Sequence, residues 1–226
     1  MSHVAVILAG CGHLDGAEVR EASYTLLALD QNDATFDCFA PDKPQASVMN
    51  HISHEKMPGE TRNVMVEAAR IARGKISDLH ELDVDKYDAI IFPGGSGAAK
   101  NLSTFAAAGE KGIVDTTVVA IVQAAYQAGK PIGFVCITPA CVGALCLGHL
   151  GVKLTIGDNH GVAAKVNATG AMHVKCRVDS VVIDEELRVV STPAYMYGEA
   201  RSREVYDGIK KMVDAVLAMV KKQVTA

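Results

Sequence analysis

The stretch PIGFVCITPA, residues 131–140, joins an apolar run to a proline and does most to decide the fold. Ile132–Val135 has the length and composition of a buried strand, and Pro139 suits the first turn of a helix, where no backbone N–H is needed. Cys136 therefore lies at a strand-to-helix turn, where the positive end of the helix is expected to lower the thiol pKa. Two interpretations stay open: a nucleophile on a strained turn, or a buried core cysteine.

Short β-branched runs alternate with helical patterns along the rest of the chain, as in parallel sheets with crossover helices. The predicted strands are residues 4–8, 35–39, 89–92, 132–135, 154–156, 180–183 and 188–191, the last two as a hairpin. The predicted helices are residues 17–29, 61–73, 116–128 and a C-terminal helix over 205–220. No repeat or linker interrupts the pattern, so we predict one α/β sandwich domain over residues 1–226.

Composition excludes several classes of protein. Apolar residues make up 49% of the chain, and the net charge is only -4, which argues against disorder. Lysine and arginine are not in excess over aspartate and glutamate, so the chain lacks the positive charge that binds phosphates and no nucleic-acid partner is expected. The uncharged stretch over residues 131–152 is interrupted by prolines and glycines, which favours a buried strand, turn and helix over a membrane span. We therefore expect no membrane partner.

The six cysteines do not resemble a disulfide framework, because the chain is long and begins without a secretory signal. We expect a reducing compartment, the cytoplasm, or the mitochondrion if a presequence has been removed. A metal site is not expected either. Cys136, Cys141 and Cys146 are five residues apart, so on a helix their sulfurs would point in three directions, and no CxxC pair is present.

Ligands of such sheets bind at loops that leave the carboxyl ends of the strands. In the loop after the first strand, Gly10 and Gly12 begin a dinucleotide-type glycine pattern, but Asp15 stands where its third glycine belongs. Asp15 and Glu18 have the spacing of an N-cap and capping box. Alternatively, Glu18 reaches the Cys136 turn and exchanges protons with the thiol or a substrate.

The loop over residues 92–101 reads FPGGSGAAKN. Glycines after a strand let backbone N–H groups approach a ligand, so Gly94 and Gly95, together with the N–H of Ile137, are candidates for an oxyanion hole. Asn101 in the same loop is a candidate substrate contact. The loop lacks the Gly-Lys-Ser/Thr of a phosphate-binding loop, and a plain connection would have the same composition.

Together these loops resemble the class I glutamine amidotransferase-like superfamily, in the branch of PfpI-type proteases and the parkinsonism-associated deglycase. More narrowly, the chain is similar to the enhancing lycopene biosynthesis (ElbB-like) family. The matching strings run over nearly the whole chain and include GCG at 10–12, DG at 15–16, ETRNV at 60–64, ARIARG at 69–74, PGG at 93–95, AAKNLS at 98–103, QAGKP at 127–131 and TPA at 192–194.

The resemblance implies a flavodoxin-like fold, a nucleophilic Cys136, an acidic partner at Glu18 and a homodimer. It also implies a glyoxalase that needs no cofactor, converts glyoxal or a related 2-oxoaldehyde to a 2-hydroxy acid, and has a link to isoprenoid biosynthesis. Many members of the superfamily carry His directly after the nucleophile, and this chain has Ile137 there. That departure argues against protease and glutaminase activity. The alternative is a regulatory or redox-sensing protein that keeps the fold and the reactive cysteine.

Overall fold

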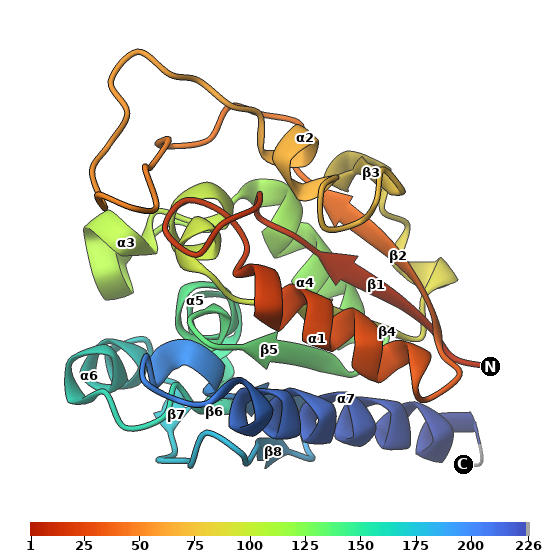
Figure 1. The fold of residues 1–226 in the computed structure, drawn as a ribbon. Helices are drawn as coiled ribbons and strands as arrows, with labels where there is room; N and C mark the ends of the chain where they lie inside the picture. Colours follow the sequence, from red (N-terminus) through yellow and green to blue (C-terminus); the bar gives the residue numbers. More distant parts are fainter. Residues whose placement is uncertain (225–226) are drawn as a thin grey trace.

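The computed structural model describes residues 1–224, so the last two residues of the predicted domain lie outside it. A seven-stranded sheet runs through the centre in the order β3-β2-β1-β4-β5-β9-β8 (Figure 1). Its strands are β1 (His3–Ile7), β2 (Thr35–Ala40), β3 (Ile76–Asp78), β4 (Ala89–Phe92), β5 (Ile132–Val135), β8 (Val182–Asp184) and β9 (Val189–Thr192). Neighbouring strands are parallel except for β8 and β9, which form the predicted antiparallel hairpin.

Helices cover both faces of the sheet. The α-helices are α1 (Val19–Asp30), α2 (Val64–Ala68), α3 (Phe105–Ala108), α4 (Thr116–Gln127), α5 (Leu145–Leu147), α6 (His160–Ala168) and α7 (Ser202–Val224). Two π-helical turns, η3 (Ala98–Leu102) and η5 (Pro139–Ala144), follow β4 and β5. Short 3₁₀ turns are η1 (Leu79–Glu81), η2 (Val84–Lys86), η4 (Gly109–Lys111), η6 (Gly148–Leu150) and η7 (Ala194–Met196).

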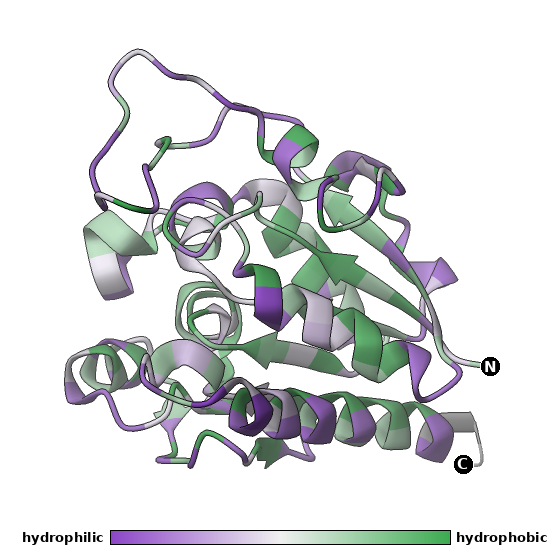
Figure 2. Ribbon diagram, in the orientation of Figure 1, coloured by the Kyte–Doolittle hydropathy of each residue, from purple (hydrophilic) through white to green (hydrophobic). Residues whose placement is uncertain are grey.

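The strands are hydrophobic on both faces, which places the sheet between two cores. Along β1, Val4 and Val6 pack in the same cluster as the buried residues of α1 and α7, and Ala5 and Ile7 pack in the cluster that contains α4 and η5. In Figure 2 the central strands are mostly hydrophobic, and α7 carries both hydrophobic and hydrophilic residues along its length. The expected three-layer α/β sandwich with a mostly parallel sheet is confirmed.

The helix predicted over residues 61–73 is much shorter than expected. Asn63 caps α2, its side chain accepting a hydrogen bond from the Val66 N–H at 3.0 Å. The helix ends at Ala68, and loose turns lead to Arg73, whose φ of +54° ends the helical path. The periodic apolar residues continue past Ala68 because the turns still bury part of their surface, so periodicity alone overestimates the helix.

The strand predicted at residues 154–156 does not join the central sheet. Instead β6 (Lys153–Leu154) pairs with β7 (Met172–His173) in a separate two-stranded sheet. The short edge strand β3 was missed because its three residues include serine and aspartate. The uncharged stretch from residue 131 forms β5, η5 and α5, and no helix in the described part of the chain is long and apolar enough to cross a membrane.

The loop after β4 packs directly on the loop before α1. The N–H of Gly97 donates to Gly16 O at 2.9 Å, and the N–H of Glu18 donates to Gly94 O at 2.9 Å. A Cβ at Gly97 would lie 2.4 Å from Gly16 Cα, and a Cβ at Gly95 would lie 2.3 Å from Glu18 N. Backbone therefore occupies the space that side chains would need, and only glycines allow these two loops to meet.

We expect Gly97→Ala to lower the free energy of unfolding by about 1–3 kcal/mol, because the new methyl group must push two backbone segments apart. Gly198→Ala is the matched control, since a Cβ there meets nothing within 4 Å and should change stability by no more than about 0.5 kcal/mol. Urea denaturation of both variants measures the difference. Equal stabilities would contradict the close packing of the two loops.

Candidate active site

Cys136 is the first residue after β5 and has a left-handed backbone, with φ of +64°. Its N–H donates to Thr192 O on β9 at 2.9 Å, and the Thr138 hydroxyl accepts from the Val135 N–H at 2.8 Å. These bonds hold a conformation that costs an L-residue about 1–2 kcal/mol. The strained strand-to-helix turn predicted from sequence is therefore present, and Cys136 lies within it with 8% of its surface exposed.

Sequence reasoning missed the carboxyl group that faces this thiol, which is Glu21. Its side chain is fully buried, and Oε1 accepts a hydrogen bond from the Tyr195 N–H at 3.0 Å. Among the described residues, Oε2 has no hydrogen-bond partner. A Cβ at Gly94 would lie 2.5 Å from Glu21 Oε2 and 2.4 Å from Cys136 Cβ. Glycine at position 94 thus leaves the space in which the carboxyl and the cysteine approach each other.

Burial dominates the ionisation of this pair. Loss of water raises the pKa of Glu21 from 4.5 to about 8, and the nearby Glu18 carboxylate adds to the rise, whereas the Tyr195 N–H and the Cys136 side chain lower it. The pKa of the Cys136 thiol is also raised, first by burial and then by Glu21, although the N–H groups of Gly95 and Ile137 lower it. The expected lowering of the thiol pKa is therefore wrong for this site, because burial and a carboxyl neighbour outweigh the six-residue η5.

Glu18 lies at the start of α1 rather than against the thiol in this arrangement. It is the N-cap residue, and its Oε2 accepts a hydrogen bond from the Glu21 N–H at 2.6 Å. The capping box predicted with Asp15 is wrong, since Asp15 Oδ2 accepts instead from the Met49 N–H at 2.7 Å. Glu18 acts on the thiol's neighbour through its charge, and a catalytic role for it stays a prediction.

The residues predicted for the oxyanion hole and for substrate contact have different roles in the structure. The N–H groups of Gly95 and Ile137 face the Cys136 sulfur, where they favour negative charge. Gly94 contributes the close approach described above. Asn101 is engaged elsewhere: its Nδ2 donates to Ala9 O at 2.9 Å and to Asp15 O at 3.0 Å, and its Oδ1 accepts from the Ala46 N–H at 2.9 Å. Asn101 therefore connects its own turn, η3, to the loop after β1 and to the segment at Ala46 through three bonds to the backbone.

Among residues 1–224, no histidine takes the place of the one absent at position 137. His160 begins α6 and His173 lies on β7 of the small second sheet. Neither is among the groups that set the pKa of the Cys136 thiol. Within residues 1–224, no group of three or more His, Cys, Asp or Glu side chains is placed to hold a metal ion, and the six cysteines are free thiols.

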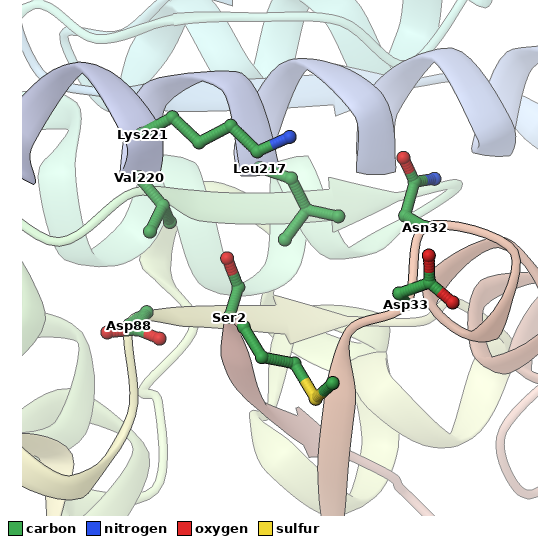
Figure 3. Close-up of a pocket in the computed structure, with 8 residues that line it drawn as sticks. Ser2, Asn32, Asp33, Asp88, Leu217, Val220 and Lys221 are labelled. Atoms are coloured by element: carbon green, nitrogen blue, oxygen red, sulfur yellow. The ribbon is translucent and has the colours of Figure 1, made fainter.

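A cavity of about 610 Å³ lies at the opposite edge of the sheet, where the parallel strands begin. Figure 3 shows its lining, with Asp33 beside Asn32, Ser2 between Asp33 and Asp88, and Leu217 and Val220 extending from α7. Asp88 is already engaged, its Oδ2 accepting from the His3 N–H at 2.8 Å. Catalytic groups of open α/β sheets gather at the carboxyl ends of strands, so this cavity is separate from the Cys136 site.

The raised pKa of Glu21 makes stability depend on pH in a defined direction. A carboxyl whose folded pKa exceeds its unfolded pKa stabilises the fold below about 4.5 and loses that contribution as the pH rises to about 8. Glu21→Gln removes the charge and keeps the shape. We expect the wild type to lose roughly 3 kcal/mol more than this variant between pH 5 and pH 8. Parallel pH profiles in urea denaturation would show instead that Glu21 ionises normally.

No family model matches the chain, but individual proteins do. The human glutamine amidotransferase-like class 1 domain-containing protein 3, mitochondrial, is 42% identical over 98% of this chain and 84% of its own length. The rat ES1 protein homolog, mitochondrial, is 41% identical over 98% of this chain and 85% of its own.

Solved structures agree with this relationship. The crystal structure of an isoprenoid biosynthesis protein with an amidotransferase-like domain from Ehrlichia chaffeensis has a TM-score of 0.90 at 40% identity, covering 97% of this chain and 100% of that one. Drosophila melanogaster DJ-1beta, at 17% identity, shares the fold with a TM-score of 0.55 and covers all of both chains. The chain therefore belongs to the family of glutamine amidotransferase-like class 1 domain proteins and ES1 homologues, as its ElbB-like motifs indicate.

Proposed function

We propose that the protein is a glyoxalase-like enzyme that converts glyoxal or a related small 2-oxoaldehyde to a 2-hydroxy acid through Cys136, without a cofactor. One observation carries the proposal: a buried carboxyl with an unpartnered oxygen lies beside a thiol on a strained turn. A carboxyl with a pKa of about 8 can both take and return a proton near neutral pH. The reaction requires both transfers.

The chemistry begins with addition of the Cys136 sulfur to one aldehyde carbon. A C–S bond forms, the thiol proton passes to the Glu21 carboxylate, and Glu21 returns that proton to the carbonyl oxygen, which gives a hemithioacetal and leaves the carboxylate free. Charge that develops on this oxygen is stabilised by the N–H groups of Gly95 and Ile137.

The next step moves hydrogen within the substrate. Glu21 removes the proton from the sulfur-bearing carbon and returns it to the neighbouring carbon of the resulting enediol. The first carbon is thereby oxidised to a thioester and the second reduced to an alcohol. Water then cleaves the C–S bond, which restores the thiol and releases the 2-hydroxy acid. The sum is one aldehyde plus one water, so no external oxidant is consumed.

This mechanism gives the proton-transfer role to Glu21, where sequence reasoning gave it to Glu18. Glu18 lies one helical turn before Glu21 and already accepts a short hydrogen bond as the helix cap. Its proximity raises the pKa of Glu21, which tunes the base instead of replacing it. A direct role for Glu18 predicts the opposite mutant behaviour, so the two assignments are separable by experiment.

Location, assembly and pathway remain proposals for this chain. The names of the human and rat relatives place those proteins in the mitochondrion, which supports the mitochondrial alternative over the expected cytoplasm. The link to isoprenoid biosynthesis is in the name of the Ehrlichia protein and extends to this chain only as a proposal. The homodimer implied by the sequence resemblance stays a prediction.

The coupled pair predicts the pH dependence of the reaction. Once the pair has lost one proton, a fixed share of molecules holds the remaining proton on Glu21 and leaves Cys136 as the reactive thiolate, so the reactivity follows the loss of that first proton. We expect the alkylation rate of Cys136 to rise about tenfold per pH unit up to about pH 8 and then to level off. Iodoacetamide labelling between pH 5.5 and 9, with the labelled peptide identified by mass spectrometry, measures this. A flat profile would show that the pair is already deprotonated at pH 5.5.

Three variants assign the roles of the site residues. Cys136→Ser should abolish turnover of glyoxal, and Glu21→Gln should lower it by about 10²-fold or more, because the acid and base are lost. Glu18→Gln should stay within a few-fold of wild type, since the glutamine side-chain oxygen can accept the same hydrogen bond from the Glu21 N–H. Steady-state rates at pH 8, with melting curves to confirm folding, test the series. A large loss in Glu18→Gln with a small one in Glu21→Gln would reverse the assignment.

A further inference from the structure

Tyr195 contacts the first turn of α1 in two ways. Its backbone N–H donates to Glu21 Oε1 at 3.0 Å, and its phenol oxygen accepts from Arg20 Nη1 at 3.0 Å. The Arg20 guanidinium carbon also lies 5.8 Å from the centre of the Tyr195 ring. Arg20 is exposed and Glu21 is buried, so these consecutive residues point to different sides of the helix. Tyr195 therefore binds both Arg20 and Glu21, although the two side chains lie on different sides of α1.

The phenol is itself fixed from a third element. Ser202, the first residue of α7, lies with its Oγ 3.1 Å from the Tyr195 phenol and 3.3 Å from Arg20 Nη1. The three side chains form a closed ring of hydrogen bonds across α1, η7 and α7. A ring of this kind restricts the rotamers of the tyrosine and of the arginine together.

The backbone that presents the Tyr195 N–H is strained. Ala194, the residue before it, is fully buried and has φ of +46°. It follows β9, whose Thr192 O accepts the Cys136 N–H at 2.9 Å, so the cysteine and the tyrosine leave adjacent strands in register. A non-glycine residue keeps such a conformation only where its surroundings hold it.

We propose that Tyr195 is a positioning residue, which uses its bond to Arg20 and its backbone N–H to hold the Glu21 carboxyl against the Cys136 thiol. This inference rests on the proposed function of Cys136 as the nucleophile. The Tyr195 N–H lowers the pKa of Glu21, since a donor favours the charged carboxylate. Loss of the phenol contact frees the loop and weakens that bond, which raises the pH at which Cys136 becomes reactive.

The test is the pH profile of Cys136 alkylation in Tyr195→Phe and in Arg20→Met, with the full chain. Both variants should move the midpoint upward by about 0.5–1 pH unit, and the double variant should move it no further than either single one, because all three remove the same contact. Arg20→Met changes an exposed residue, so it carries the test if Tyr195→Phe fails to fold. A purely structural role would lower the melting temperature without moving the midpoint.

Tyr206→Phe is the matched control. The Tyr206 phenol also ties α1 to the rest of the protein, but at the opposite end, where it donates to Gln31 Oε1. Its loss should leave the midpoint unchanged. Midpoints equal to wild type in Tyr195→Phe and Arg20→Met, with Cys136 still the labelled thiol, would overturn the positioning role and leave the proposed function intact. Preferential labelling of another cysteine in the wild type would overturn both.

Discussion

The rest of this site depends on the contact between a buried carboxyl group, that of Glu21, and the Cys136 thiol. Glu21 lies on the buried side of α1, so the helix can pack on the sheet only if that carboxyl is either neutral or well solvated by protein groups. The Tyr195 N–H donates to one oxygen, and the Gly94 N–H and the Cys136 side chain also favour the charged form, but the second oxygen accepts no hydrogen bond of normal geometry among the described residues. The fold thus tolerates an incompletely satisfied acid where the proposed chemistry needs one.

Four loops, which follow β1, β4, β5 and β9, are brought together to build this arrangement. The glycines after β4 let their backbone lie directly on the segment before α1, which sets the depth at which Glu21 enters the interior. The end of β5 supplies the cysteine, and the end of β9 supplies the N–H that orients the carboxyl. Because these strands are parallel neighbours, their carboxyl ends meet at one edge, and side chains far apart in sequence share a small volume.

The sequence predicts the fold well where apolar runs are long and bounded. Ile132–Val135 lies where its pattern indicates because the strand is buried along its whole length, and the helix that begins at Thr116 does so because its buried residues recur on one side. The prediction over residues 61–73 fails because periodicity cannot distinguish a helix from successive turns that bury the same side chains.

The candidate site, like the fold, is only partly predictable from the sequence. Cys136 is identified by its position between a strand and a proline, but its partner is not, since Glu18 and Glu21 stand one turn apart on the same helix. Only the rotation of α1 against the sheet decides which of them points inward, and the local sequence indicates that rotation weakly. The spacing of Glu21 from the buried Ala22, Thr25 and Leu29 is the single hint that the inward side includes this position.

The buried acid also changes the number of protons that the folded protein binds. The formal net charge of -4 counts every carboxylate as ionised. With a pKa of about 8, Glu21 keeps its proton at neutral pH, so the folded protein carries a charge nearer -3. Unfolding at pH 7 then releases close to one proton into the buffer, and its measured enthalpy includes the ionisation heat of whichever buffer takes that proton up.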